Sequence, residues 1–534
     1  MNILLTAINA KYIHSNLAVY SLRACAGEYR DAVELAEYTI NNQKDYILEE
    51  LYKRKPDVLC FSCYIWNIDY VTDIAREYKK LCPSVPIWVG GPEVSYEVEA
   101  FLRENPYIDG VMIGEGEDTF RELCGYYAHK RKLGDIAGIA FRKNSTGNST
   151  SNRTSVNNAG CKAGEIVFTS PRPIKNMSEI PFCYDTLDDF SNRIIYYESS
   201  RGCPFSCSYC LSSVDKTLRF RDTEIVKREL KFFIDQKVPQ IKFVDRTFNC
   251  NHAHAMELWR FIKANDNGVT NFHFEISADL LNQEELELIS DMRPGLIQLE
   301  IGVQSTNEVT IKEIHRTMKL ERLKEVVKLI QSGNNIHEHL DLIAGLPYED
   351  YDSFGRSFDE IYELKPNQLQ LGFLKVLKGS YMFEHAAEYG IVYHDKPPYE
   401  VMSTKWLSFD DVIKIKRVED MLEVYYNSGQ FEITMKLMEC IFDSAFEFFQ
   451  ELGDFYEANG YFGMSHSRIR RCEILLEFLA LYLHGCDSDA ITSVGLSENH
   501  GDRDNTDFDE NAQIYKMIQE SLIFDLYYRE NCKS

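Results

Sequence analysis

The sequence predicts an α/β protein in three parts: a doubly wound parallel sheet, a partial barrel of six parallel strands, and an all-helical C-terminal domain. Three observations predict it. Short apolar runs alternate with helical patterns up to about residue 130, six further strand–helix units follow from Ile194, and helical periodicity replaces strands after about residue 400. We expect the domains to span residues 1–135, 186–395 and 396–534, with a linker over 136–185.

The composition is that of a globular chain with a strong acidic balance. Of 534 residues, 44% are hydrophobic and 26% charged, enough for about three or four domains. Lys plus Arg is 58 and Asp plus Glu is 83, a net charge of −25, which disfavours nucleic acid or an anionic membrane as the main partner. No apolar run approaches the ~20 residues that span a bilayer. The first residues lack the basic segment of a signal peptide, so we expect a cytoplasmic protein.

The first part predicts a sheet whose ligand site lies at the carboxyl ends of its strands. We expect strands over Asn2–Thr6, Ala32–Glu37, Asp57–Ser62, Ile87–Val89 and Gly110–Ile113, and a helix over Ile68–Leu81.

Glycines follow two of these strands. They lie in the loops Gly90-Gly91-Pro92 and Gly114-Glu115-Gly116-Glu117. Neither loop is a G-x-G-x-x-G motif, and Glu115 and Glu117 would repel a pyrophosphate, so we do not expect a nucleotide here. Glycine still allows a broad, flat ligand to approach the backbone closely, whereas the alternative is that both loops are simple turns.

The second part predicts a partial barrel, because six strand–helix units are too few for the full eight. The expected strands are Ile194–Glu198, Gln240–Val244, Asn271–Ile276, Leu296–Ile301, His339–Ala344 and Gln368–Leu374, with helices such as Ile225–Asp235 and Ala253–Ala264. A stretch rich in Asn, Ser, Thr and Gly, residues about 143–165, predicts a flexible insertion in the linker before it.

The third part predicts helices that pack on one another. Apolar side chains recur on one helical face at Phe409, Val412, Val418, Met421, Leu422 and Tyr425. Stripes of this kind are more often core than cofactor site, and no metal or nucleophile motif accompanies them.

Three of the fifteen cysteines form the strongest motif in the chain. Cys203, Cys207 and Cys210 follow the first barrel strand at C-x-x-x-C-x-x-C spacing. Three ligands are too few for a structural zinc site or an ordinary cluster, each of which takes four. A [4Fe–4S] cluster held by three thiolates keeps one iron open for chemistry. A zinc site completed by a distant His, or chance crowding, remains the alternative.

Cys60 and Cys63 also have C-x-x-C spacing, but they belong to a buried strand. Positions three apart on a strand point to opposite faces, so we do not expect this pair to share a metal. The other cysteines are expected to be reduced thiols.

The triple-cysteine motif resembles that of the radical S-adenosylmethionine (SAM) superfamily. The resemblance implies a (βα)6 barrel in which a [4Fe–4S] cluster on Cys203, Cys207 and Cys210 cleaves SAM to a 5′-deoxyadenosyl radical. The positions that match the superfamily's SAM contacts are Tyr209, Asp245, Glu275, Gln304, Arg316, Asp341 and Leu374.

Several of these positions have an implied role. The resemblance places Asp245 at the SAM amino group, although the loop departs from the common Gly-Gly-Glu form. It places Gln304 at the ribose and Arg316 at the carboxylate, where a guanidinium binds in a bidentate manner. Asp341 would accept from a hydroxyl, and the backbone near Leu374 would meet the adenine. Glu275 and Asp341 stand on otherwise apolar strands, where an unpaired carboxylate is costly.

The N-terminal part resembles the cobalamin-binding domain of cobalamin-dependent radical SAM enzymes. The matching loops imply that Gly90, Gly91, Gly114, Glu115 and Gly116 contact the corrin. The D-x-H-x-x-G motif that supplies an axial His elsewhere is missing from the sequence, so the sequence names no protein ligand to cobalt. His14 is a candidate to face the cofactor or the substrate; a solvent-facing or helix-capping role is the alternative.

Together these motifs imply a cobalamin-dependent radical SAM enzyme that methylates or rearranges an unactivated carbon. An electron donor such as flavodoxin or ferredoxin and a small-molecule substrate are the implied partners. One alternative is a methylthiotransferase-like RNA modifier, but its second set of cluster cysteines and its basic appendage are missing from the sequence. The other is a non-catalytic iron–sulfur redox or sensor protein, which would need no SAM pocket.

Overall fold

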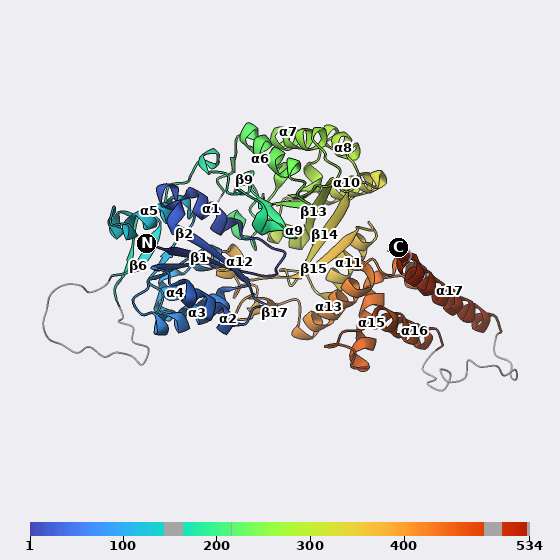
Figure 1. Cartoon of the computed structure of the whole chain (residues 1–534). Helices are drawn as coiled ribbons and strands as arrows, with labels where there is room; N and C mark the ends of the chain where they lie inside the picture. The colour runs from blue at the N-terminus through green and yellow to red at the C-terminus, as the bar shows by residue number, and fades with distance from the viewer. Residues whose placement is uncertain (144–163, 215, 485–504, 531–534) are drawn as a thin grey trace.

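The computed structural model describes residues 1–143, 164–214, 216–484 and 505–530 (Figure 1). It has the predicted α/β architecture, in which the first sheet lies beside the barrel and helices α16 and α17 lie at the far end of the molecule. The insertion predicted around residues 143–165 falls almost entirely outside the described residues.

The first sheet has seven strands in the order β2-β1-β3-β4-β5-β6-β7, of which the first five are parallel. The strands are β1 (Ile3–Asn9), β2 (Val33–Thr39), β3 (Val58–Ser62), β4 (Ile87–Gly90), β5 (Gly110–Met112), β6 (Ile139–Arg142) and β7 (Ile166–Phe168). Strands β6 and β7 are antiparallel and come from the segment expected to be a linker, so the sheet extends further along the chain than the sequence indicated.

Helices cover both faces of this sheet, as a doubly wound fold requires. They are α1 (Leu17–Cys25), α2 (Lys44–Arg54), α3 (Ile68–Leu81), α4 (Val98–Glu104) and α5 (Glu117–Tyr127). Helices α1 and α5 pack on one face and α2, α3 and α4 on the other. The predicted apolar face of α3 is buried except for Leu81, which is 55% exposed at the helix end.

Cys60 and Cys63 confirm the strand argument. Cys60 belongs to the core on the α1/α5 face, whereas Cys63, one residue past β3, belongs to the core on the other face. Both thiols are fully buried. The pair therefore cannot bind one metal ion.

The barrel is an open, fully parallel sheet in the order β15-β14-β13-β12-β11-β8. Its strands are β8 (Ile195–Tyr197), β11 (Gln240–Phe243), β12 (Asn271–Ile276), β13 (Ile297–Gln304), β14 (His337–Ala344) and β15 (Gln368–Phe373). The helices that follow them are α6 (Thr223–Asp235), α7 (His252–Ala264), α8 (Gln283–Ser290), α9 (Glu308–Glu313), α10 (Leu320–Gly333) and α11 (Tyr351–Tyr362). The predicted six-stranded partial barrel is confirmed.

The N-terminal part touches the edge of this barrel through the loop between β1 and α1. The N–H of Ile194 donates to the carbonyl of Ile13 at 2.8 Å, and His14 forms a parallel bridge with Ile194. The Ser15 hydroxyl donates to the Ile194 carbonyl at 2.8 Å. The loop thus pairs with the residue that precedes β8, at the free edge of the barrel.

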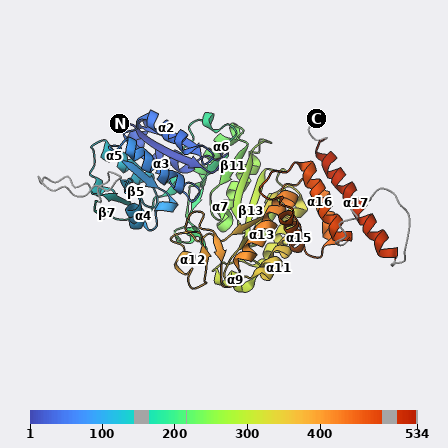
Figure 2. The same ribbon diagram turned by 90° about the horizontal axis from the view of Figure 1, so that it is seen from below.

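The C-terminal part is helical after a small hairpin of β16 (Val392–Tyr393) and β17 (Val401–Ser403), so strands continue slightly past residue 400. Its helices are α13 (Phe409–Leu422), α14 (Glu432–Ile441), α15 (Ala445–Ala458), α16 (Arg468–His484) and α17 (Asn505–Glu530). Phe409 is exposed, but the other residues of the predicted stripe are buried. Figure 2 shows α16 and α17 as a pair that projects from this part. Among the described residues, no helix is both long and apolar enough to cross a membrane.

Candidate active site

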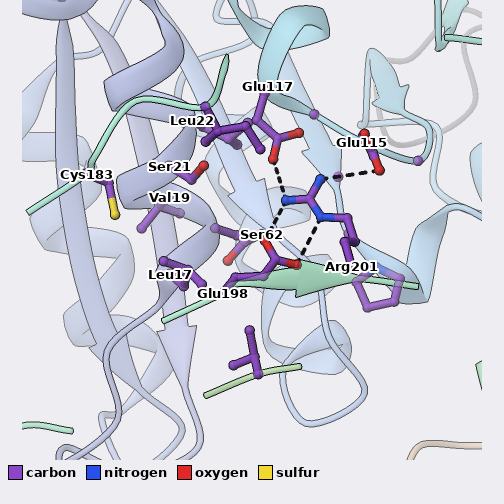
Figure 3. A pocket seen from close by; sticks show the side chains of 18 of the residues that line it. Leu17, Val19, Ser21, Leu22, Ser62, Glu115, Glu117, Cys183, Glu198 and Arg201 are labelled. Carbon is purple, nitrogen blue, oxygen red and sulfur yellow. Dashed lines mark hydrogen bonds and ion pairs between the residues drawn. The ribbon is translucent and has the colours of Figure 1, made fainter. Parts of the chain in front are cut away.

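A cavity of about 590 Å³ lies between the first sheet and the mouth of the barrel (Figure 3). One wall comes from the loops after β3, β4 and β5, and the other from the ends of β8 and β11. All five residues predicted to contact cobalamin line it: Gly90, Gly91, Gly114, Glu115 and Gly116. The cavity therefore stands where the carboxyl ends of both sheets meet.

The glycines of these loops serve different purposes. Gly91 has φ +123°, and a Cβ there would collide with the carbonyl oxygen of Cys63, so the turn itself requires glycine. Gly114 has φ +73°, and a Cβ there would meet no atom within 4 Å. A Cβ on Gly116 would lie 3.0 Å from the end of the Leu22 side chain. The loop of Gly114 and Gly116 thus leaves room for a flat ligand.

Arg201 joins the two walls of this cavity (Figure 3). Its guanidinium lies 2.8 Å from a carboxylate oxygen of Glu117 and 2.7 Å from one of Glu198, and 3.4 Å from Glu115. Glu115 also pairs with Arg219. Burial works to raise the pKa of Glu115, but Arg219 and Arg201 hold it below its usual value. The Glu115 carboxylate therefore forms part of the ion-pair contact between the two parts of the chain.

A second, smaller cavity of about 150 Å³ lies in the barrel mouth. It brings together five of the residues predicted to hold the cluster or SAM: Cys207, Glu275, Gln304, Arg316 and Asp341. Thr247 and Glu300 complete much of its wall. These side chains come from three strands, β12, β13 and β14, and from three loops, so the barrel mouth is what assembles them.

Several polar atoms in this second cavity lack partners. The Arg316 guanidinium contacts the Gly302 carbonyl, the Tyr209 hydroxyl at 3.4 Å and the Cys207 Sγ at 3.9 Å, while its Nε is unpaired. Gln304 Oε1 and Asp341 Oδ1 are also buried without a partner among the described residues. Unpaired buried polar atoms are costly unless a ligand satisfies them. The cavity therefore fits a polar ligand such as SAM.

The backbone at Gln304 has an unusual conformation. Gln304 has φ +77°, and the pairing of β13 with β14 shifts register between Gly302 and Gln304. A left-handed conformation at a residue with a side chain is sparsely populated and tends to mark functional sites. The irregular backbone at Gln304 thus lies at the end of β13, in the wall of the smaller cavity.

Three predicted SAM contacts do not line this smaller cavity: Tyr209, which contacts Arg316, and Asp245 and Leu374. Asp245 is fully buried and accepts from the Ser199 N–H at 2.9 Å and from the Ser199 and Ser200 hydroxyls at 2.6 Å, so its side chain braces the start of the cysteine loop. The Leu374 N–H donates to Ala344 at 2.9 Å and its carbonyl accepts from Val401 at 2.8 Å. Neither residue lines the second cavity. The contact of Asp245 and Leu374 with SAM therefore stays a prediction.

The three cysteines share one loop between β9 (Ser200–Arg201) and β10 (Arg219–Phe220) at the carboxyl end of β8. Cys203 Sγ lies 3.7 Å from the Thr247 hydroxyl. In the described part of the chain, no set of three or more His, Cys, Asp or Glu side chains is gathered closely enough to hold a metal ion. Three sulfur donors on one loop fit an iron–sulfur cluster in kind, and their convergence on it stays a prediction.

A polar cluster inside the barrel escaped the sequence interpretation. Glu300 lies 2.8 Å from the Lys242 ammonium and 2.9 Å from His273 Nε2. Although burial favours the neutral acid, His273 and Lys242 lower the pKa of Glu300 to about 2. Every second residue of these strands points into the barrel, and the period-two spacing of polar residues was the signal that could have revealed the cluster.

His14 lies between the two parts. Its Nδ1 is 2.7 Å from the Tyr196 hydroxyl on β8. Asn16, not His14, caps α1, since its side chain accepts from the Val19 N–H. His14 therefore contacts the barrel edge rather than solvent alone or a helix end.

Comparison with known proteins agrees with this arrangement. Residues 3–124 match the model of the B12 binding domain, residues 197–361 that of the radical SAM superfamily, and residues 387–534 that of a protein family of unknown function, DUF4080. The chain therefore contains a B12-binding domain and a radical SAM domain. More particularly, the chain has the domain pairing of cobalamin-dependent radical SAM proteins, followed by a DUF4080 domain.

Individual relatives are distant. An uncharacterized methyltransferase from Pyrococcus horikoshii is 24% identical over 374 residues, which are 68% of this chain and 75% of that protein. The cobalamin-dependent radical SAM methyltransferase TokK from Streptomyces tokunonensis is 28% identical over 364 residues, 64% of this chain but 49% of TokK. The cobalamin-dependent SAM radical enzyme OxsB shares the fold with a TM-score of 0.61 at 15% identity, covering 99% of this chain and 80% of OxsB.

Proposed function

We propose that this protein is a cobalamin-dependent radical SAM methyltransferase that acts on a small molecule. One observation carries the proposal: the cavity at the B12-binding loops and the cavity at Cys207 and Arg316 meet at Arg246, which lines both. Ligands in the two cavities would face each other across the barrel mouth. A substrate held between them could be approached from both sides.

Different residues of the chain would bind the cluster and SAM. When bound, the [4Fe–4S] cluster, SAM and cobalamin would supply the electron, the 5′-deoxyadenosyl radical and the methyl group. Cys203, Cys207 and Cys210 would hold the cluster, while Arg316 would bind the SAM carboxylate and Asp341 a hydroxyl. The barrel wall around these residues would exclude water.

The relatives support methylation more than rearrangement. Three of the most similar proteins are named as methyltransferases. An anaerobic magnesium-protoporphyrin IX monomethyl ester cyclase from Rubrivivax gelatinosus is also similar, at 22% identity over 64% of this chain and 60% of that protein. Rearrangement or cyclisation is therefore the second candidate.

The experiment is a turnover assay on anaerobically reconstituted full-length protein with dithionite as the reductant. SAM carrying a deuterated methyl group is expected to yield 5′-deoxyadenosine and, in an extract of a deletion strain, a metabolite heavier by one labelled methyl group. Formation of 5′-deoxyadenosine with a product that lacks the label would favour the second candidate. No SAM cleavage by protein with an intact cluster would contradict both.

We further propose that the electron donor is a flavodoxin or ferredoxin and that the protein works in the cytoplasm. The described cysteines are free thiols, which suits a reducing compartment. The acidic net charge of −25 continues to disfavour an RNA substrate. Reduction by purified flavodoxin in place of dithionite tests the donor.

A further inference from the structure

Arg246 stands at the junction of the two cavities without a partner. It lies three residues past the end of β11, is exposed, and lines both cavities. No carboxylate of the described residues lies within ion-pair distance of its guanidinium, and no side-chain hydrogen bond is formed there. A cation left free beside two binding cavities is available to a ligand.

The other arginines around these cavities are all engaged. Arg201 binds Glu117 and Glu198, Arg219 binds Glu115, and Arg221 binds Glu229 at 2.6 Å. Arg201 and Arg219 therefore stabilise the contact between the two parts of the chain, and Arg221 is paired within the barrel. Arg316 has no carboxylate partner either, but it contacts the Gly302 carbonyl, the Tyr209 hydroxyl and Cys207 Sγ. Arg246 differs because its guanidinium has neither an ion pair nor a hydrogen bond among the described residues.

Tyr64 shares the larger cavity with Arg246. Its ring stacks on Trp66 with centroids 4.4 Å apart and planes 7° apart, which fixes its direction. Burial raises the pKa of Tyr64 to about 12, while Arg246 works against that shift, so the two groups interact electrostatically. The hydroxyl stays protonated at neutral pH and can donate a hydrogen bond.

The surroundings of Arg246 also contain negative charge at longer range. Glu275 in the smaller cavity and Glu198 in the larger one face the same junction. Glu198 is bound to Arg201, whereas Arg246 works to lower the pKa of Glu275, which burial raises. Arg246 therefore offsets part of the repulsion that these carboxylates would exert on an anion at the junction.

We propose that Arg246, assisted by the Tyr64 hydroxyl, binds an anionic group of the substrate, a carboxylate or a phosphate, and so positions the substrate between the two cavities. A guanidinium binds either group through two parallel hydrogen bonds, which fixes orientation as well as position. The inference rests on the proposed methyltransferase function, because that function requires a substrate at this junction.

The test is protection of Arg246 from phenylglyoxal, a reagent for accessible arginines, in the full-length protein carrying its cluster and cobalamin. Peptide mass spectrometry follows the modification of Arg246 and of Arg260, an exposed arginine on α7 far from the junction. We expect inorganic phosphate or acetate at millimolar concentration to slow modification of Arg246 by about threefold or more and to leave Arg260 unchanged. Whichever anion protects Arg246 better, phosphate or acetate, indicates whether the substrate group is a phosphate or a carboxylate.

Matched variants separate substrate binding from cofactor binding. Arg246→Gln should abolish anion binding at this site but leave SAM affinity, measured by calorimetry, and bound cobalamin, measured by absorption, unchanged. Arg246→Lys should restore part of the anion binding. Arg260→Gln is the control. Tenfold weaker SAM binding, or loss of cobalamin, in Arg246→Gln would assign the residue to a cofactor and overturn the proposal. Lack of protection by either anion would overturn it too. Cleavage of SAM by the wild-type protein tests the proposed function independently of these results.

Discussion

The guanidinium of Arg201 and the carboxylate of Glu117 lie 2.8 Å apart although 84 residues separate them in the chain. Arg201 begins the cysteine loop, and Glu117 begins the helix that follows the second glycine loop. The same guanidinium also holds Glu198 and Glu115. One cation thus keeps three carboxylates together where the two parts of the chain meet.

Removing this cation should loosen the molecule. Arg201→Leu leaves the 7%-exposed Glu117 side chain without its partner, and we expect the free energy of unfolding to fall by about 3 kcal/mol. Urea denaturation measures the loss. The control is Arg103→Leu, whose pair with Glu99 is solvent-exposed and should be worth less than about 1 kcal/mol. Equal effects of the two substitutions would refute a special role for Arg201.

The cysteine loop makes a spectroscopic prediction. Cys203→Ala, Cys207→Ala and Cys210→Ala should each abolish the brown iron–sulfur absorbance and SAM cleavage after anaerobic reconstitution. The double variant Cys60→Ala/Cys63→Ala should keep both, because those thiols lie in separate cores. Loss of the cluster in this double variant, with the fold intact by circular dichroism, would contradict the assignment.

Arg316 should determine SAM affinity. Arg316→Gln removes the charge-assisted partner of the SAM carboxylate but keeps N–H donors for the Gly302 carbonyl. Binding should weaken by about 1.5–3 kcal/mol, measured by calorimetry on protein with an intact cluster. An unchanged dissociation constant would leave Arg316 only its observed contacts to the cysteine loop.

Gly116 offers a steric test of the cobalamin cavity. Valine there should block uptake of hydroxocobalamin, because the new side chain fills space beside the flat ligand. The fold should tolerate it, since the nearest atom, 3.0 Å from the added Cβ, is the end of the flexible Leu22 side chain. Absorption spectra report cobalamin and cluster together. Gly91→Val is unsuitable for comparison, because it would collide with the Cys63 backbone.

Glu338 should make stability depend on pH. It is fully buried on β14 with both carboxylate oxygens unpaired, and burial raises its pKa from 4.5 to about 8. The unfolded chain loses this proton first, so its contribution to stability falls as pH rises from about 5 to 8, by at most about 1.4 kcal/mol per pH unit.

Glu338→Leu should remove that slope and gain stability over the wild type most strongly at pH 8. Thermal unfolding across this pH range is the measurement. Glu321→Gln, at a side chain 85% exposed, serves as the control whose profile should follow the wild type. Parallel profiles for Glu338→Leu and the wild type would show that the buried carboxyl does not titrate as described.

The sequence predicted the strands well because their signals are local. Apolar runs of the right length marked β1 to β5 and the six barrel strands, and the alternation of faces separated Cys60 from Cys63. Strands β6 and β7 escaped because each is short and they pair across the intervening insertion. Side-chain contacts were harder to predict, since a motif indicates which residues lie near a site but not which way each side chain points.

Asp245 and the barrel cluster illustrate this difficulty. Asp245 matches a motif position, yet its carboxylate turns toward Ser199 and Ser200. Lys242, His273 and Glu300 come from three strands, and their contact depends on a register that no local pattern specifies. Arg246, likewise, gains its importance only from the two cavities that meet beside it.

The loop of Ile13 and His14 along β8 has a consequence for handling the protein in fragments. In an open barrel, β8 would otherwise present unpaired N–H and C=O groups to any passing chain, which is the usual origin of strand-to-strand aggregation. The N-terminal part therefore shields this edge of the barrel from other chains. A barrel expressed without the N-terminal part should therefore aggregate more readily than the full-length protein.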